Sequence, residues 1–289
     1  MNFNQFLKLL RVEHWVKNLF LFIPAFFDAR LFEPELLARA VAGFFAFSLV
    51  ASSVYILNDL VDAPHDRNHP EKKNRPIAAG LIGRRTAIML SVGLLAAGLG
   101  WSAFLTPKLL IISGLYFFQN LLYSFWLKHI ALIDISLIGL GFLLRVFAGG
   151  AVTGTAVSQW LIVLTFLLAM ILGLAKRRGE YLVETRGHTF RRALEGYNLP
   201  FIDVSMVVSS TVAIMAYLMY CFSTEVITRI GSDRVFYTCF FVILGILRYL
   251  QLTLVFNRTE SPTRVLWRDR FTQIVLFLWI ASFAWLLYR

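Results

Sequence analysis

The chain has 289 residues, of which 58% are hydrophobic and 16% are charged, and its mean hydropathy is +0.68. A soluble domain has roughly a quarter of its residues charged, so this composition excludes an ordinary soluble protein. The net charge of +11 comes from basic residues that flank apolar segments and form no single basic stripe. This distribution argues against a nucleic-acid-binding protein.

The apolar residues lie in nine blocks, each close to the length of ~20 residues that a helix needs to cross the hydrocarbon core of a bilayer. We predict one all-α domain over residues 1–289, a polytopic membrane bundle of nine transmembrane helices. Lys17 and Asn18 interrupt the first block. The predicted spans are residues 14–29, 35–57, 86–105, 108–126, 131–152, 158–175, 201–223, 234–256 and 270–288.

The basic residues gather on alternate connecting segments. With nine spans, one side of the membrane holds most of the Lys and Arg residues, in segments 1–13, 58–85, 127–130, 176–200 and 257–270. Because loops rich in Lys and Arg stay in the cytoplasm, we predict that these segments face the cytoplasm. As the localisation, we predict that the protein is integral to a bacterial-type inner (plasma) membrane. A homo-oligomer is compatible with the sequence.

Three aspartates, Asp59, Asp62 and Asp66, follow the second block. If this segment is helical, spacings of three and four residues place the carboxylates on one face. Like charges this close repel, so a positive group should lie between them, and a hard cation such as Mg²⁺ prefers oxygen ligands of this kind. We therefore predict these three aspartates as catalytic residues, with Asp62 and Asp66 as ligands of Mg²⁺.

Basic residues follow the aspartates in the same loop, and Arg75 is one of them. Acids followed by bases suit a metal-bound diphosphate that is held by cations, so we predict that Arg75 binds substrate. The alternative is a charged, solvated loop without chemistry. Pro64 and Pro70 predict that the helix ends or kinks in this region.

Several other ionisable residues lie inside or beside apolar blocks. Lys128 is either an anchor at the cytoplasmic boundary or a substrate contact, and Lys17 has the same two interpretations. Asp134 and Arg145 lie within the fifth block, where ionisable side chains usually face a bundle interior or a cavity. We favour a polar cavity over a structural network for this pair, and a structural partner for Arg248 in the eighth block.

The sixth block ends in Lys176-Arg177-Arg178-Gly179-Glu180. The three cations either anchor the carboxyl end of the helix or bind phosphate oxygens, for which the arginine fork is suited. We favour anion binding. Glu180 and Glu184 are four residues apart, which suits either a second metal or salt bridges.

The motif Asn58-Asp59-x-x-Asp62-x-x-x-Asp66 resembles the first aspartate motif of the UbiA superfamily of membrane prenyltransferases, and the nine spans extend the resemblance over the whole chain. Members that use prenyl diphosphates usually have a second aspartate-rich motif after the sixth span, where this chain has residues 176–180. That segment resembles the decaprenyl-phosphate phosphoribosyltransferase branch, together with Trp15-Val-Lys17-Asn18, Tyr123-x-x-x-Leu127-Lys128 and Arg192-x-x-Leu-x-x-Tyr197.

The resemblance implies transfer of 5-phosphoribose from phosphoribosyl diphosphate to a polyprenyl monophosphate, with release of diphosphate, in the synthesis of a cell-envelope glycolipid precursor. It implies that Asp62 and Asp66 hold Mg²⁺ on the diphosphate, that Asn58 and Asp59 complete or orient the metal shell, and that cations bind the lipid phosphate. The substrate-binding residues that it implies are Lys17, Asn58, Arg75, Tyr123, Lys128, Lys176, Arg177, Arg178 and Glu180.

Two other functions compete with this one. The first is a UbiA-type polyprenyltransferase that joins a polyprenyl diphosphate to an aromatic acceptor in quinone biosynthesis. The second is a transporter or lipid-binding membrane protein, for which an acidic relay or broken helices in matching halves would be typical. The sequence has one acid that we expect to be buried, Asp134, and no clear inverted repeat, which disfavours the transporter.

Overall fold

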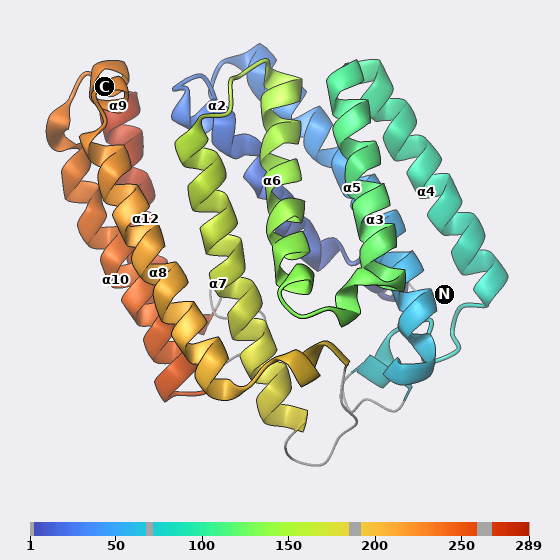
Figure 1. Cartoon of the computed structure of the whole chain (residues 1–289). Coiled ribbons are helices and arrows are strands. Elements are labelled where there is room, and N and C mark those ends of the chain that lie inside the picture. Colours follow the sequence, from blue (N-terminus) through green and yellow to red (C-terminus); the bar gives the residue numbers. More distant parts are fainter. Residues whose placement is uncertain (1–2, 68–71, 185–191, 259–267, 289) are drawn as a thin grey trace. The chain divides into compact units, whose positions relative to one another are not determined.

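The computed structural model describes residues 3–67, 72–184, 192–258 and 268–288 (Figure 1). Every regular element in these ranges is a helix and none is a strand, which confirms the all-α prediction. Seven helices in them are long and apolar enough to cross a membrane, whereas the sequence predicted nine spans. The seven are Pro34–Pro64, Arg84–Leu105, Ile133–Thr153, Gln159–Leu182, Leu199–Phe222, Asp233–Val255 and Arg270–Leu287.

The other two predicted spans are not among the seven. The first block forms the 3-10 helix η1 (Val12–Phe22) and the short helix α2 (Ile23–Phe27) instead of one long α-helix. Asn18 is buried there and donates to Ser48 Oγ at 2.8 Å, so a polar contact replaces contact with lipid. The fourth block forms α5 (Pro107–Phe125), a continuous 19-residue α-helix that includes Gln119 and Asn120 and is not among the seven apolar helices.

The chain packs as two compact units. Residues 1–127 and 141–157 form the first unit, and residues 128–140 and 158–289 form the second. Helix α6 (Ile133–Thr153) therefore contributes its first turns to the second unit and the remainder to the first. The single domain over residues 1–289 remains a prediction.

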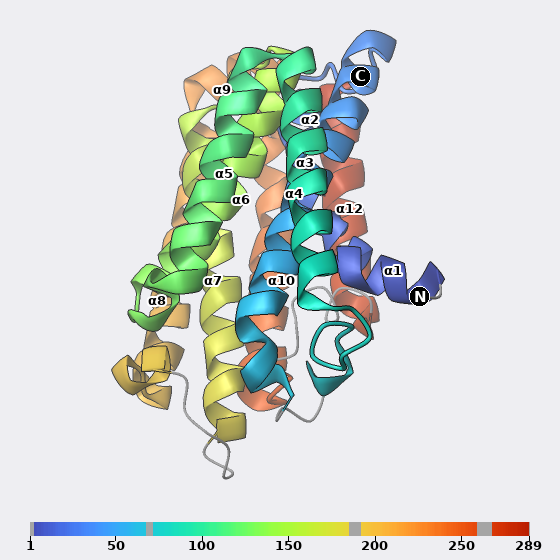
Figure 2. The same cartoon turned by 90° about the vertical axis from the view of Figure 1, so that its right-hand side faces the viewer.

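The first unit is built around α3 (Pro34–Asp66), which packs against α4 (Arg84–Leu105) and α5 (Figures 1 and 2). Its core includes Phe47, Val50 and Ala51, all fully buried. Gly98 lets α4 approach α3 closely, because a Cβ atom at this position would lie 2.7 Å from a methyl group of Val50. The helix α1 (Phe3–Leu10) and the 3-10 helix η2 (Lys72–Asn74) complete the unit.

The amino-terminal segment is fixed to α3 by hydrogen bonds. Ser52 Oγ donates to the carbonyl oxygen of Leu10 at 2.8 Å, and Trp15 Nε1 donates to Ser52 Oγ at 3.0 Å. Ser48 and Ser52 are four residues apart and therefore share one face of α3. These contacts place the residue that follows Leu10 against the last turns of α3.

The second unit contains most of the carboxyl-terminal half. A core that includes Ile135, Leu174, Ile202 and Met206 joins the first turns of α6 to α7 and α8. A π-helical turn, η6, directly follows α10. The elements are η3 (Leu127–His129, whose last two residues belong to this unit), α7 (Gln159–Glu184), η4 (Arg192–Gly196), α8 (Leu199–Phe222), α9 (Thr224–Ile230), η5 (Asp233–Thr238), α10 (Cys239–Leu250), η6 (Gln251–Val255) and α12 (Arg270–Leu287).

Gly149 in α6 provides a test of packing in the first unit. A Cβ atom there would lie 1.9 Å from the carbonyl oxygen of Leu21, which is backbone and cannot rotate away. We expect Gly149→Ala to lower the free energy of unfolding by about 1–3 kcal/mol, measured by thermal unfolding in detergent. Gly93→Ala in α4 is the matched control, because nothing lies within 4 Å of its Cβ position. Equal stability of the two variants would contradict the close approach of α6 to Leu21.

Candidate active site

The aspartate motif lies in the last turns of α3. The sequence predicted a helix end or kink near Pro64, and α3 ends two residues later at Asp66. The motif is therefore helical, and Asp59, Asp62 and Asp66 share one face, as the spacing predicted. Asp59 and Asp66 are only 2% and 4% exposed, although carboxylates are seldom buried without a partner.

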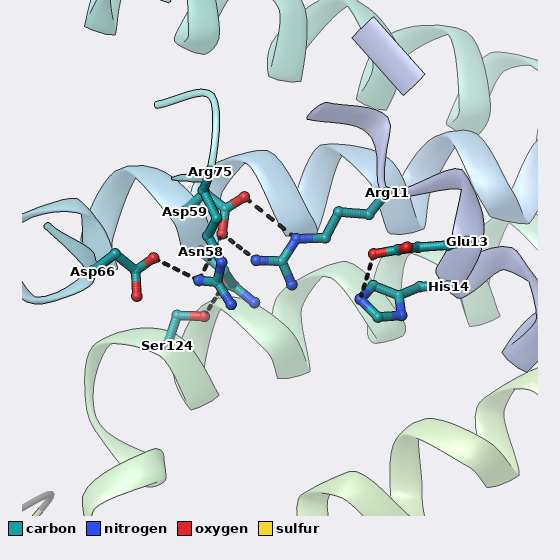
Figure 3. Close-up of polar contacts among 8 residues, drawn as sticks. All are labelled: Arg11, Glu13, His14, Asn58, Asp59, Asp66, Arg75 and Ser124. Carbon is teal, nitrogen blue, oxygen red and sulfur yellow. Dashed lines mark hydrogen bonds and ion pairs between the residues drawn. The ribbon is translucent and has the colours of Figure 1, made fainter. Parts of the chain in front are cut away.

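Arg75 is the partner of both buried carboxylates (Figure 3). Its Nη1 lies 3.1 Å from Asp59 Oδ1 and 2.5 Å from Asp66 Oδ2. One guanidinium nitrogen therefore occupies the position between two negative charges where the sequence predicted a positive group. Arg75 follows η2, and its backbone N–H donates to the carbonyl oxygen of Lys72 at 3.0 Å.

Arg11 pairs with Asp59 from the other side (Figure 3). Its Nε donates to Asp59 Oδ2 at 3.3 Å, and its Nη2 contacts Asp59 Oδ1. The backbone of Arg11 has φ 50° and ψ 46°, a left-handed conformation that is uncommon for a residue other than glycine. Its guanidinium also lies 5.4 Å from the ring centroid of Tyr55. Such strain persists where the surroundings enforce it, and here Ser52 holds the adjacent Leu10.

Four other residues of the predicted site belong to the first unit. Asn58 Oδ1 accepts a hydrogen bond from Ser124 Oγ of α5, which links the motif to that helix (Figure 3). Asp62 is half-buried on α3, and Tyr123 is half-buried next to Ser124. Lys17 is half-buried in η1.

The chemistry of this cluster fits a hard divalent cation. Two buried carboxylates on one helix face already hold a cationic group between them, and carboxylate oxygens are the ligands that Mg²⁺ prefers. Within the described residues, no three His, Cys, Asp or Glu side chains converge as they would around a metal ion. The donor atoms therefore suit the metal in type and charge.

In the second unit, Arg177 is the centre of a buried ion network. Its Nε donates to Asp134 Oδ2 at 2.6 Å, and its Nη1 contacts Glu180 Oε2. Tyr197 Oη donates to Asp134 Oδ1 at 2.8 Å and accepts from the backbone N–H of Leu132. Arg177 and Asp134 are both 0% exposed. The Glu180 interaction is thus a salt bridge, one of its two predicted interpretations, and the side chain of Glu184 lies outside the described residues.

Arg178 is engaged by a different set of acceptors. Its Nε donates to Asp203 Oδ1 at 2.8 Å, and its Nη1 donates to the carbonyl oxygen of Thr253 at 2.9 Å and to Asn257 Oδ1 at 2.6 Å. These partners connect α7 to α8 and to the π-helical turn η6. Phosphate binding by Arg177 and Arg178 stays a prediction, and the structure gives each of them a structural role.

Two further predictions concern charged residues inside the spans. Arg248 donates to both oxygens of Asp269, at 3.1 and 2.6 Å, which confirms the structural partner. The hydrogen bonds from Arg248 hold the pKa of Asp269 well below its usual range. Asp134 and Arg145 have separate partners, so the predicted shared cavity is replaced by two networks.

Arg145 is buried in the first unit among neutral acceptors. It donates to Asn18 Oδ1 at 2.7 Å, to the carbonyl oxygen of Gly141 at 2.7 Å and to Tyr116 Oη at 2.9 Å. Its guanidinium lies 4.8 Å from the centroid of the Tyr116 ring. Hydrogen bonds and aromatic faces thus stabilise a charge that would otherwise be costly in a span.

The remaining predicted cations belong to the second unit. Lys128 in η3 is buried, which is unusual for a lysine that only anchors a helix at the membrane boundary. The side chain of Lys176 is 51% exposed, and its Nζ lies 3.9 Å from Glu180 Oε1. Of the three consecutive cations, Lys176 is the one with a largely accessible side chain.

Comparison with known proteins agrees with this architecture. Residues 19–281 match the UbiA prenyltransferase family. The chain belongs to this family. Decaprenyl-phosphate phosphoribosyltransferase of Mycolicibacterium smegmatis is 30% identical over 98% of this chain and 92% of its own length. The enzyme of the same name from Corynebacterium glutamicum is also 30% identical, over 95% of this chain and 84% of its own length.

A solved UbiA structure has the same fold. The UbiA homolog of Archaeoglobus fulgidus, determined with GPP and Mg²⁺ bound, superposes with a TM-score of 0.74 over 98% of this chain and 99% of its own, at 19% identity. The family match, the two transferases that are 30% identical and the seven apolar helices identify the chain as an integral membrane transferase of the UbiA family. This structural likeness concerns the fold alone.

Arg11 is the site residue that sequence reasoning missed. It counted only as one of the cations that set the membrane orientation, because one arginine in a basic segment carries no further signal. Its partner Asp59 is 48 residues away, and the left-handed backbone that aims it is not readable from local propensity. The one local signal for a role of Arg11 was its position just before the apolar block 14–29, which Lys17 interrupts.

Proposed function

We propose that this UbiA-family transferase moves 5-phosphoribose from phosphoribosyl diphosphate to a polyprenyl, decaprenyl-type monophosphate and releases diphosphate. The observation that carries the proposal is the 30% identity over nearly the whole chain to enzymes named for decaprenyl-phosphate phosphoribosyl transfer. The segment Lys176–Glu180 supports it, because it stands where prenyl-diphosphate users usually have their second aspartate motif. We place the site on the cytoplasmic face of a bacterial-type plasma membrane, in the synthesis of a cell-envelope glycolipid precursor.

The residues of the first unit suit the donor half of this reaction. Asp62 and Asp66 are the proposed ligands of Mg²⁺, while Asn58 and Asp59 complete or orient them. Bound there, the metal would neutralise charge on the leaving diphosphate. Arg75 offers a planar fork for phosphate oxygens, and Asp59, held between Arg11 and Arg75, keeps both guanidinium groups at the motif.

The acceptor half needs cations and little proton transfer. The bond from C1 of the ribose to the diphosphate oxygen breaks, and a bond from C1 to an oxygen of the lipid phosphate forms. A phosphate oxygen is already anionic at neutral pH, so no general base is required. We propose Lys17, Tyr123, Lys128 and Lys176 as contacts of the phosphorylated substrates, since cations and hydroxyl groups bind phosphate oxygens.

A reconstituted assay tests this function. Purified protein in nanodiscs is supplied with Mg²⁺ and one of two pairs, either phosphoribosyl diphosphate with decaprenyl phosphate, or a polyprenyl diphosphate with an aromatic acid. We expect a phosphoribosylated lipid, identified by mass, from the first pair only. A prenylated aromatic product from the second pair, with none from the first, would assign the protein to the quinone branch instead.

A further inference from the structure

The structure places one nitrogen of Arg75 against Asp66, which is one of the two proposed ligands of the metal ion, and against the neighbouring Asp59. Arg75 Nη1 is within hydrogen-bonding distance of carboxylate oxygens of both Asp59 and Asp66 (Figure 3). These two carboxylates are almost fully buried, so water screens their charges weakly and a positive group between them is strongly favoured. A guanidinium group and a divalent cation cannot occupy this position together.

We propose that Arg75 competes with the divalent cation by holding its ligand Asp66 in the substrate-free protein, and that it leaves Asp66 only when a diphosphate arrives to bind its guanidinium. The proposal rests on the proposed function for the presence of a metal-bound diphosphate. It does not depend on whether that diphosphate carries a ribose or a prenyl chain.

The charges of the cluster explain why the exchange requires both components. Arg11 and Arg75 carry two positive charges and Asp59 and Asp66 carry two negative charges, so these four side chains sum to zero, and Asp62 on the same face adds one negative charge. A dication alone would add two positive charges and place the displaced Arg75 next to them. A dication that arrives with a diphosphate brings its own negative charge, and the phosphate oxygens replace the carboxylates as partners of Arg75.

The two arginines differ in how firmly they are held. Arg11 is fixed by its contact with the Tyr55 ring and by the adjacent Leu10, whose carbonyl oxygen accepts from Ser52. Arg75 lies in a loop after η2, and its side chain is more exposed than that of Arg11. Arg11 is therefore the permanent counter-ion and positioning residue of Asp59, and Arg75 is the exchangeable one.

This arrangement couples two binding events. Since Arg75 competes with the metal for Asp66, metal alone binds weakly, and diphosphate strengthens metal binding by removing the competitor. Linkage requires the reverse as well, so the metal strengthens diphosphate binding by the same factor. The protein takes up the cation and the diphosphate together.

Binding of Mn²⁺ to purified, substrate-free protein tests the competition without any catalysis. Mn²⁺ takes the same oxygen ligands as Mg²⁺, and the free ion is counted by its electron paramagnetic resonance signal. We expect Arg75→Gln to bind Mn²⁺ at least roughly tenfold more tightly than the parent, which is the scale of one charged hydrogen bond. The double variant Arg75→Gln/Asp66→Asn should lose this gain, which would locate the ion at the carboxylates.

Two further variants control for charge and for folding. Arg39→Gln removes an exposed arginine that pairs with Glu35 at the other end of α3, and its Mn²⁺ affinity should equal that of the parent. Arg75→Lys keeps the charge but replaces the fork with one ammonium group, so an affinity between those of the parent and Arg75→Gln is expected. The proposal would be overturned if Arg75→Gln and Arg75→Lys bound Mn²⁺ with the same affinity as the parent. It would also be overturned if none of the three proteins bound Mn²⁺.

A second measurement separates this inference from the proposed function. Retention of radiolabelled inorganic diphosphate by the parent should require Mn²⁺. In Arg75→Gln, the factor by which Mn²⁺ increases the affinity for diphosphate should be at least roughly tenfold smaller. Because inorganic diphosphate contains neither ribose nor lipid, this result is independent of the substrate assay. Retention that is equally strong with and without Mn²⁺ in the parent would show that the two events are not coupled.

Discussion

Replacing Asp66 with asparagine should lower turnover by at least about 100-fold, the scale of losing one group that stabilises charge in the transition state. The amide keeps the size of the carboxylate and can still accept a hydrogen bond from Arg75, so the end of α3 should stay folded. It removes the negative charge that a cation would need at this position. The measurement is the initial rate of lipid product formation in nanodiscs at saturating Mg²⁺, with thermal unfolding as the check on the fold.

The control for Asp66→Asn is Glu35→Gln on the same helix. Glu35 is an exposed carboxylate in the first turn of α3 and pairs with Arg39 at 2.7 Å, so the substitution removes a similar ion pair far from the motif. It should leave turnover unchanged. Asp62→Asn should resemble Asp66→Asn, because Asp62 is the other proposed ligand. Near-normal rates in either Asp variant would move the site away from this motif.

Replacing Arg177 with alanine should destabilise the protein by about 3–5 kcal/mol, the usual cost of leaving a buried charge without its partner. Asp134 is fully buried, and Arg177 is the cation that contacts its carboxylate. The loss would be read as a lower unfolding temperature in detergent. A residue that served only to bind phosphate would behave differently, since its removal would raise the Michaelis constant and leave the unfolding temperature unchanged.

Two matched variants make this test specific. Lys176→Ala removes the neighbouring cation, whose side chain is half-exposed, and should cost less than about 1 kcal/mol. The double variant Arg177→Met/Asp134→Asn removes both charges and keeps an acceptor for Tyr197, so it should recover part of the stability lost in Arg177→Ala. Full stability of Arg177→Ala would argue against the structural role of this arginine and favour its predicted role in phosphate binding.

The sequence was most informative where the structure depends on local patterns. Hydropathy placed α4, α6 and α12 within a few residues, because a helix in lipid must be apolar along its length. The spacing of Asp59, Asp62 and Asp66 predicted their common face, since the helical period alone determines it. The same spacing predicted a positive group between the carboxylates, but it could not say that this group is Arg75.

The sequence was least informative about the partners of the arginines. Arg177 pairs with a residue 43 positions away, and Arg178 with one 79 positions away. A cation at the cytoplasmic end of a helix has the same local sequence whether it anchors the helix, binds phosphate or closes a buried network. The first block misled for a related reason: its hydropathy resembled a span, whereas the polar contacts of Trp15 and Asn18 with α3 hold it as a 3-10 helix.

The π-helical turn Gln251–Val255 has a consequence for how relatives of this chain should be aligned. In it, the backbone N–H of Phe256 bonds five residues back to Gln251, one more than in an α-helix. Deleting one residue would restore an α-helical register and rotate Asn257 by about 100°, away from Arg178. A one-residue gap at this turn should therefore accompany the absence of an arginine at position 178, whereas gaps in surface loops should occur independently of it.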